Sequence, residues 1–554
     1  MPKHDRRLSP PRFSATRCGG ACARGALTLV LALSWAVAGA QQPAAPAATT
    51  PATSAPSSTP SQTPAARPEP RFDVLEYVIV GNTVLDAESI ERAVTPFLGP
   101  GRTMADVESA RSALERAYQG RGFQSVGVDV PEQRIDDAVV TLQVVEATVG
   151  RLRVRGARYY SPGVIAATLP SAAEGTVPQF ADVGAELAKV NAAPGLVVTP
   201  ALKPGRTPGT LDIDLDVQDR SPLVASIDLN NQRALNTTPW RLGLGLRHTN
   251  LWERRHTLGV GVMFTPADPS QVKVFTASYA APLGGPQDPV LSAYAIKSDS
   301  ETPTPIGNTT VLGGQTVVGL RMTTPLRVHN DLFHTWSVGL DYKRLDQQDF
   351  PLLTYMPASL GYTALRSVRG AVSQFETSLA MSFGGLVNEQ EAFAARRYLG
   401  SASFATLRWD ASHEQPIGTV LSVRGRFSGQ FAQQALVPAE QFAAGGANSV
   451  RGYLESSVFG DRGMLGSLEL RTVPHELRNA VTAQWLAFYD IAQTSIVDPL
   501  PEQQTGYTLA GAGAGLRLRW GRTASAAIDL ARSIHAVPAQ DTGWRAHVRL
   551  QLEL

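Results

Sequence analysis

This 554-residue sequence has little cysteine and no long apolar run beyond its first forty residues. Its two cysteines, Cys18 and Cys22, lie near the N-terminus, so the rest of the chain has no disulfide framework. The motifs G-x-S-x-G and H-E-x-x-H are missing, and the nine histidines are scattered. These absences argue against an enzyme, a metal site and a cofactor site, and we expect none of the three.

The first forty residues have the pattern of a secretion signal. Basic residues precede the apolar run GALTLVLALSWAVAGA at 25–40, which ends in small residues typical of a cleavage site. The run is short for a membrane anchor, so we predict a signal peptide over 1–40. This segment carries six of the 50 basic side chains and one of the 48 acidic ones. The remainder is therefore close to neutral, and we expect no nucleic-acid partner.

Residues 41–70 form a segment rich in proline and alanine. It contains eight prolines, few charges and no apolar periodicity. This composition predicts an extended, disordered linker. Patterned sequence begins directly afterwards, at residue 71.

Two consecutive segments, 71–147 and 148–219, each have the pattern strand, helix, helix, strand, strand. The second helix of the first segment has a Thr103…Asp106 capping pair ahead of an apolar face. Both segments end in sequences of period two, AVVTLQVVEA and TLDIDLDVQD, which indicate strands. The pattern predicts two α+β domains. Helices are expected at 87–98, 104–119, 162–169 and 180–191.

From residue 220 to residue 554 the apolar period is two. In the last segment, WRAHVRLQLEL, apolar residues alternate with arginine, histidine, glutamine and glutamate. The sequence TLAGAGAGLRLRW places alanine, leucine and tryptophan on one face and glycine and arginine on the other. A polar face rich in charge and glycine suits a wet lumen, so we predict an all-β transmembrane barrel rather than a soluble sandwich. Strands are expected near 222–231, 240–250, 256–265, 272–281, 289–298, 312–323, 334–344, 354–368, 370–384, 400–412, 418–432, 464–473, 481–493, 506–520, 524–533 and 544–554.

The tetrapeptide S-V-R-G occurs three times, starting at Ser367, Ser422 and Ser449. The first copy lies between two expected strands, and the second lies within one, where its arginine faces the lumen. The third lies in the longest expected loop, 433–463, after the sequence QFAAGG and before Tyr453. Glycine on both sides allows a sharp fold, so this loop can carry its arginine back into the barrel.

The third copy also carries a family resemblance. The sequence V-R-G-Y at Val450, Arg451, Gly452 and Tyr453 resembles the signature of the long sixth extracellular loop in transporters of the Omp85 superfamily. The two α+β segments resemble POTRA domains, the periplasmic modules of that superfamily. The sequence VGNTVL at 80–85 resembles the usual first turn of such a domain.

The family pairs its loop arginine with the acid of an F-x-D motif. Phe488 and Asp490 match this motif, two strands beyond the loop. Glu469 has the inward parity of its own strand and is a second candidate partner. A solvated loop residue is the alternative role for Arg451. An arginine and a carboxylate confined in a lumen would instead form a charge-assisted pair that holds the loop.

Residues 72–554 resemble the TpsB transporters of two-partner secretion, the ShlB/FhaC/HecB-type haemolysin secretion/activation family. This resemblance guided the count of about sixteen antiparallel strands, an even number that is the rule for bacterial barrels. It implies an outer-membrane location with the POTRA domains in the periplasm. The implied client is a large, unfolded TpsA-type exoprotein of the haemolysin or adhesin class, secreted through a porin-like channel. Outer-membrane lipid and, during biogenesis, the outer-membrane assembly machinery are the other implied partners.

Two features depart from the family pattern. Such transporters often begin with an amphipathic helix that plugs the pore, but the prolines of 41–70 would each cost a helix about 3 kcal/mol. Loop 433–463 is therefore the expected occluder of the pore. Outer-membrane strands usually end in an aromatic residue, whereas this chain ends in Leu554, which weakens the assembly signal.

Three other functions compete with export. An insertase of the same superfamily would share the loop motif, but it usually carries more POTRA units than the two that fit before residue 220. An outer-membrane enzyme is disfavoured because no catalytic set is evident. A passive porin has no use for two periplasmic domains. We favour client contact at a POTRA edge strand over a spacer role for those domains.

Overall fold

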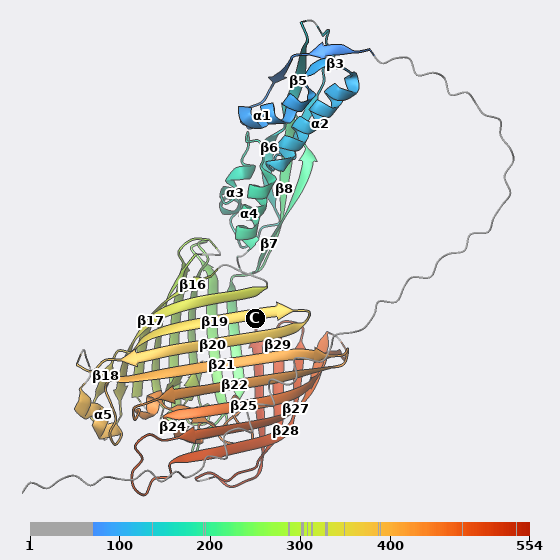
Figure 1. Cartoon of the computed structure of the whole chain (residues 1–554). Helices are drawn as coiled ribbons and strands as arrows, with labels where there is room; N and C mark the ends of the chain where they lie inside the picture. The colour runs from blue at the N-terminus through green and yellow to red at the C-terminus, as the bar shows by residue number, and fades with distance from the viewer. Residues whose placement is uncertain are drawn as a thin grey trace, which may run out of the picture. The chain divides into compact units, whose positions relative to one another are not determined.

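The computed structural model shows two small α+β units followed by an all-β barrel (Figure 1). The predicted signal peptide and all but the last residue of the predicted linker lie outside the described residues. The described residues are 70–554 except 136, 192, 194, 286–287, 301–303, 307–308, 312–313, 327–330, 348–349, 386, 388, 479 and 539.

The first unit packs two helices on a three-stranded sheet of order β2-β5-β4, with β1 and β3 paired beside it. The expected capping pair is present, because the backbone N–H of Thr103 donates to the Asp106 carboxylate over 2.8 Å. The expected helix at 87–98 ends early as a 3-10 turn, because Pro96 has no N–H to continue the helical ladder. The elements are β1 (Phe72–Val74), β2 (Glu76–Val80), α1 (Ala87–Val94), β3 (Gly99–Arg102), α2 (Met104–Gly120), β4 (Val126–Asp129) and β5 (Val139–Glu146).

The second unit repeats this arrangement with a sheet of order β6-β8-β7. The strand β6 is parallel to β8, and β7 and β8 form the expected hairpin. Apolar residues from both helices and all three strands form one core, with Leu169 and Leu215 fully buried. The elements are β6 (Thr148–Arg155), α3 (Pro162–Ala167), α4 (Phe180–Asn191), β7 (Leu196–Pro204) and β8 (Thr210–Asp219).

Helices are short throughout the described residues. The longest is α2, with 17 residues. Within the described ranges, none of the helices combines the length and the apolarity needed to cross a membrane.

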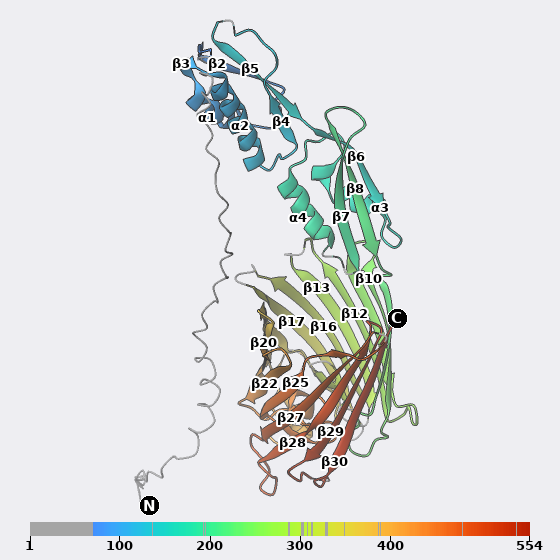
Figure 2. The same ribbon diagram turned by 90° about the vertical axis from the view of Figure 1, so that its right-hand side faces the viewer.

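Sixteen of the remaining strands form a closed antiparallel barrel, as the sequence predicts. Each strand pairs with its neighbours in sequence, and β30 returns to pair with β9, where Leu550 lies opposite Leu229. Figure 2 shows these last strands, in red, beside the first barrel strands, in green. The main strands are β9 (Leu223–Asn230), β10 (Arg241–Leu251), β11 (His256–Phe264), β12 (Val272–Pro282), β13 (Val290–Ser300), β16 (Gly314–Pro325), β17 (Leu332–Asp346), β19 (Ala358–Val368), β20 (Ala371–Ser382), β21 (Phe404–Ile417), β22 (Leu421–Ala432), β25 (Arg462–Thr472), β27 (Val481–Ser495), β28 (Gly506–Trp520), β29 (Ala524–Ser533) and β30 (Trp544–Glu553).

Several local features differ from the prediction. The expected strand at 354–368 is split at Pro357, which cannot donate to the ladder and whose carbonyl instead accepts the N–H of Asp341. A short helix forms where no element is expected, and the long loop, whose observed bounds are 433–461, contains two short strands. The additional elements are β14 (Thr304–Ile306), β15 (Thr309–Val311), β18 (Leu353–Tyr355), α5 (Gln390–Arg396), β23 (Phe442–Ala444), β24 (Val458–Gly460) and β26 (His475–Glu476).

Side chains alternate between the two faces of the barrel wall. On β27, Trp485 and Tyr489 are exposed on the outer face, whereas Phe488 and Asp490 are buried on the inner face. This is the alternation expected of strands with lipid outside and a lumen inside. Because β9 begins and β30 ends at one end of the barrel, we call that end proximal and the opposite end distal. The loop 433–461 joins its strands at the distal end.

Candidate functional site inside the barrel

The long loop 433–461 folds into the barrel rather than over it. Val450 and Tyr453 are fully buried and pack against Leu465 and Leu509, which belong to the barrel strands β25 and β28. A solvated surface loop could not bury its apolar side chains in this way. The loop therefore occupies part of the lumen.

Arg451, within this loop, forms a bidentate salt bridge with Asp490 of β27. The distance from Nε to Oδ2 is 2.7 Å, and that from Nη2 to Oδ1 is 2.8 Å. Nη2 is also 2.8 Å from Oε1 of Glu469 on β25. The structure thus brings both predicted acids to the guanidinium, in a site from which water is largely excluded. A third acid, Asp529 of β29, lies 4.0 Å from Nη1.

The ring of Phe488 completes this cluster. Its centroid lies 3.4 Å from the guanidinium carbon of Arg451, which is a cation–π contact. Phe488 and Asp490 reach the same guanidinium because residues two apart on a strand share one face. The neighbouring Gly513 leaves the ring its space, since a Cβ there would lie 2.8 Å from Cζ of Phe488.

Glycines let the loop backbone approach the wall directly. Gly452 has a φ of +97°, and a Cβ on it would lie 2.8 Å from the backbone nitrogen of Ser533. On the wall, a Cβ on Gly511 would lie 2.0 Å from the carbonyl oxygen of Arg451. Gly511 of β28 therefore leaves the space that the loop backbone occupies.

The other two residues of the motif form hydrogen bonds with the last strands of the barrel. The N–H of Gly452 donates to Nε2 of His547 on β30 over 3.0 Å. The hydroxyl of Tyr453 donates to the carbonyl of His535 over 2.7 Å and accepts the N–H of Ala510 over 3.3 Å. The motif therefore contacts β27, β28, β30 and the segment after β29.

Other arginines share the acids at this site. Glu469 is shared with Arg471, with Nε 2.7 Å from Oε2, and Asp529 is shared with Arg517 over 2.8 Å. Arg471 in turn pairs with Glu414 over 3.1 Å, so Arg451 belongs to a wider ion-pair network. Removing one partner of such a buried network would leave an unpaired charge, at a cost of about 3–5 kcal/mol.

Two contacts of the site have no signal that singles them out in the sequence. His547 and Asp529 both have inward parity, but so do many other polar residues of the last strands. Only the position of the folded loop selects them. Among the described residues, no group of three or more His, Cys, Asp or Glu side chains is placed to bind a metal ion.

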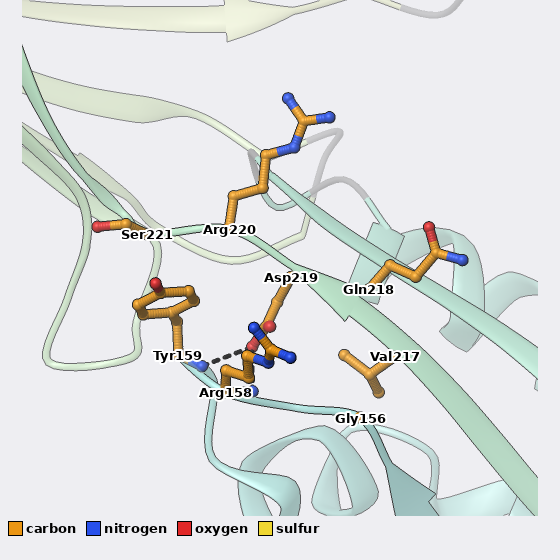
Figure 3. Close-up of a pocket in the computed structure, with 8 residues that line it drawn as sticks. All are labelled: Gly156, Arg158, Tyr159, Val217, Gln218, Asp219, Arg220 and Ser221. Atoms are coloured by element: carbon orange, nitrogen blue, oxygen red, sulfur yellow. Dashed lines mark hydrogen bonds between the residues drawn. The ribbon is translucent and has the colours of Figure 1, made fainter. Parts of the chain in front are cut away.

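A second feature lies at the end of β8, in the second α+β unit. A hollow of about 470 Å³ is lined by Tyr159, Asp219 and Arg220, among others (Figure 3). The Asp219 carboxylate accepts the backbone N–H groups of Arg158, Tyr159 and Tyr160 over 2.8, 2.6 and 3.0 Å. Burial opposes ionisation of Asp219, but these donors outweigh it and hold the pKa of the carboxyl below its usual value. Asp219 therefore fixes the turn after β6 to the exit of β8.

Comparison with protein families gives two matches along the chain. The family described as haemolysin secretion/activation protein ShlB/FhaC/HecB matches residues 209–518. The POTRA domain of ShlB type matches residues 72–147. Together they cover the first α+β unit and most of the barrel.

Individual proteins show the same likeness at low identity. The heme/hemopexin transporter protein HuxB of Haemophilus influenzae is 20% identical over 426 residues, covering 74% of this chain and 73% of that protein. The outer membrane transporter CdiB of Dickeya dadantii is 21% identical over 424 residues, covering 72% of each.

Solved structures share the fold. CdiB from Escherichia coli superposes with a TM-score of 0.59 at 19% identity, covering 89% of this chain and 92% of that one. BamA from Haemophilus ducreyi, lacking POTRA domains 1–3, superposes with a TM-score of 0.53 at 14% identity, covering 87% and 100%.

Proposed function

Because this chain belongs to the haemolysin secretion/activation family ShlB/FhaC/HecB, we propose that its loop 433–461 controls the passage of one large exoprotein through the barrel. The chain is a TpsB-family outer-membrane transporter that secretes a partner exoprotein, and it is not an enzyme. Its barrel lies in the outer membrane and its POTRA domains lie in the periplasm. The distal end of the barrel therefore faces the outside of the cell.

The observation that carries the proposed role of the loop is its burial in the lumen. Arg451 reaches Asp490 and Glu469 only because the loop passes inside the wall. An exoprotein crossing the barrel must share the lumen with this segment or displace it. The residues of the motif, Val450 to Tyr453, and their wall partners would then set how firmly the loop is held.

The proposed function assigns a role to each of five segments of the chain. We assign residues 1–40 to a signal peptide and 41–70 to a linker. Residues 71–147 and 148–219 are the two POTRA domains that receive the unfolded client, and 220–554 is the conducting barrel. The client belongs, in this proposal, to the haemolysin or adhesin class of TpsA exoproteins.

We place client capture at the edge strand β2 (Glu76–Val80), where an extended peptide can add to the sheet. The two edges of the second POTRA sheet are less open. On β7, Pro200 lacks an N–H, and both backbone groups of Val198 bond to the side chain of Asn191. On β6, both backbone groups of Val149 bond to the chain at 175–176.

Site-specific photo-crosslinking tests this assignment. A photoreactive residue in place of Val78 on β2 should trap the client, whereas one in place of Val197 on β7 should not. Both side chains are exposed, so a client can reach the photoreactive group at either position. Equal trapping at the two positions would contradict the choice of β2.

The proposed export function is tested by deleting the gene and comparing the culture supernatants. One very large protein should disappear from the supernatant, while the outer-membrane profile stays unchanged. An unchanged supernatant with a joint loss of several outer-membrane proteins would instead indicate an insertase. Restoring the gene on a plasmid controls for effects on neighbouring genes.

A further inference from the structure

A second buried ion cluster lies in the first half of the same loop. Glu440 is only 2% exposed. Its Oε1 lies 2.5 Å from Nζ of Lys343 on β17 and 2.8 Å from the hydroxyl of Tyr355 on β18. Its Oε2 lies 3.3 Å from Nη2 of Arg408 on β21. One carboxylate from the loop thus meets three donors from three segments of the wall.

The backbone at this point is held as firmly as the side chain. The carbonyl oxygen of Glu440 accepts the side-chain amide of Gln430 over 2.9 Å and Nη2 of Arg408 over 3.1 Å. The amide of Gln430 also bonds the carbonyl of Asp461, at the other end of the loop. Gln430 of β22 therefore ties Glu440 to the last residue of the loop.

Apolar side chains surround this cluster at the distal end. Phe393 of α5 is fully buried and makes an edge contact with the ring of Tyr355, with the centroids 5.4 Å apart. Phe404 and Leu436 join the same core. Low polarity around Glu440 strengthens its ion pairs and makes the loss of one partner costly.

The two ion clusters attach the loop to different arcs of the barrel. Glu440 contacts β17, β18 and β21, whereas Arg451 contacts β25, β27 and β29. In the strand order, β22 separates the two sets. The ten residues between the attachments, 441–450, must therefore run from one arc of the inner wall to the other.

We propose that Glu440 is a second anchor of the loop, and that this anchor keeps the pore closed when no client is present. Without the Glu440 carboxylate, the loop would still be attached to β27 through Arg451, but its first half would keep only backbone bonds to Gln430 and Arg408 at this point and would leave the lumen more readily. Glu440 acts here as a positioning residue, because it fixes the chain that occludes the pore. This inference deepens the proposed role of the loop and rests on it.

The test uses the full-length protein in planar lipid bilayers without any client. Glu440→Gln should raise the open probability of the pore by about tenfold or more, because Lys343 and Arg408 lose their shared anion. Glu502→Gln is the matched control, since Glu502 is an exposed acid in another distal loop. Heat-dependent migration of the folded barrel on gels confirms that each variant is assembled.

A thiol readout reports the position of the loop directly. Ala439 is buried beside the anchor, so Ala439→Cys should resist a membrane-impermeant maleimide in the parent protein. In the Glu440→Gln background the same cysteine should become labelled, while Glu502→Cys should be labelled in both backgrounds. A purely structural defect that leaves the loop in place would not change this labelling.

The inference is overturned if Glu440→Gln forms a folded barrel with unchanged open probability and a protected cysteine at position 439. If Glu440→Gln does not assemble, Lys343→Met is tested instead for open probability and for labelling at position 439. This variant is the milder one, because Glu440 keeps its contacts with Arg408 and Tyr355. The bilayer assay needs no client. A failure of this inference is therefore distinct from a failure of the proposed export function, which the supernatant comparison reports.

Discussion

The carbonyl oxygen of Arg451 occupies the place that a side chain on Gly511 would take. A Cβ at Gly511 would lie 2.0 Å from this oxygen, closer than any real contact. The loop and β28 are thus in backbone contact, and the position of the arginine depends on a missing side chain as well as on its acidic partners. This relationship gives the first prediction.

Gly511→Ala should displace the loop from β28 and weaken the Arg451 contacts without disturbing the strand. We expect greater labelling of a reporter cysteine in the loop and reduced export of the client. Gly425→Ala is the matched control, because a Cβ on that strand glycine would have no atom within 4 Å. Labelling at the level of the Gly425→Ala control would show that the loop can tolerate the added methyl.

Arg451→Ala should reduce export by about tenfold or more while leaving barrel insertion largely intact, because it leaves Asp490 and Glu469 without their cation. Arg451→Lys should restore little of the export, since an ammonium group cannot form the bidentate salt bridge. Export is measured as client in the supernatant, and insertion as heat-modifiable barrel. Arg369→Ala is the control, because Arg369 belongs to an S-V-R-G copy in the exposed turn between β19 and β20. Normal export by Arg451→Ala would refute the role of the loop.

Docking of the loop should weaken as pH rises. Burial raises the pKa of Glu455 to about 7, against the opposing effects of the Ala447 N–H and the charge of Arg241. In an undocked loop this carboxyl would titrate near the ordinary glutamate pKa of 4.5. Between these two values the docked form holds a proton that the undocked form has lost, so the contribution of Glu455 to docking is greatest below about pH 4.5 and declines until about pH 7.

The measurement is the rate of cysteine labelling in the loop at several pH values, corrected for the intrinsic reactivity of the thiol. Labelling should increase from acid to neutral pH and then level off. Glu455→Gln should remove this dependence, because an amide does not titrate. A pH profile that is the same in the variant would assign the effect to another group.

In the second POTRA domain, Asp219→Ala should loosen the turn after β6, because three backbone N–H groups lose their acceptor. The expected loss is about 1–3 kcal/mol in the free energy of unfolding. The pKa of Asp219 is lower in the folded protein than in the unfolded chain. Its contribution to stability is therefore fully present above the unfolded-state pKa and is lost as the pH falls through the folded-state pKa.

Limited proteolysis of the full protein measures this effect through cleavage near Tyr159. Cleavage should accelerate in Asp219→Ala and, in the parent protein, at acid pH. Asp216→Ala, an exposed change on the same strand, should leave the rate unchanged. Equal rates in the two variants would show that the three hydrogen bonds do not hold the turn.

Local features of the sequence were enough for much of the fold. The period of two identified the barrel strands, and the capping pair at Thr103 located the start of α2. The helix α5 was missed because its seven residues are too few for a clear helical period. The break at Pro357 was missed because alternation continues on both sides of it.

The sequence by itself determined which side chains face the lumen, because Cβ atoms alternate along a strand whatever the strand pairs with. Motif resemblance further singled out Arg451 and Asp490, and the inward parity of its strand added Glu469 as a second candidate partner. Only the tertiary structure decided that Glu440 meets Lys343, which is 97 residues away, and that Gly452 meets His547, which is 95 residues away. Such contacts depend on strand register and on the path of one loop through the lumen, and no local pattern encodes either of them.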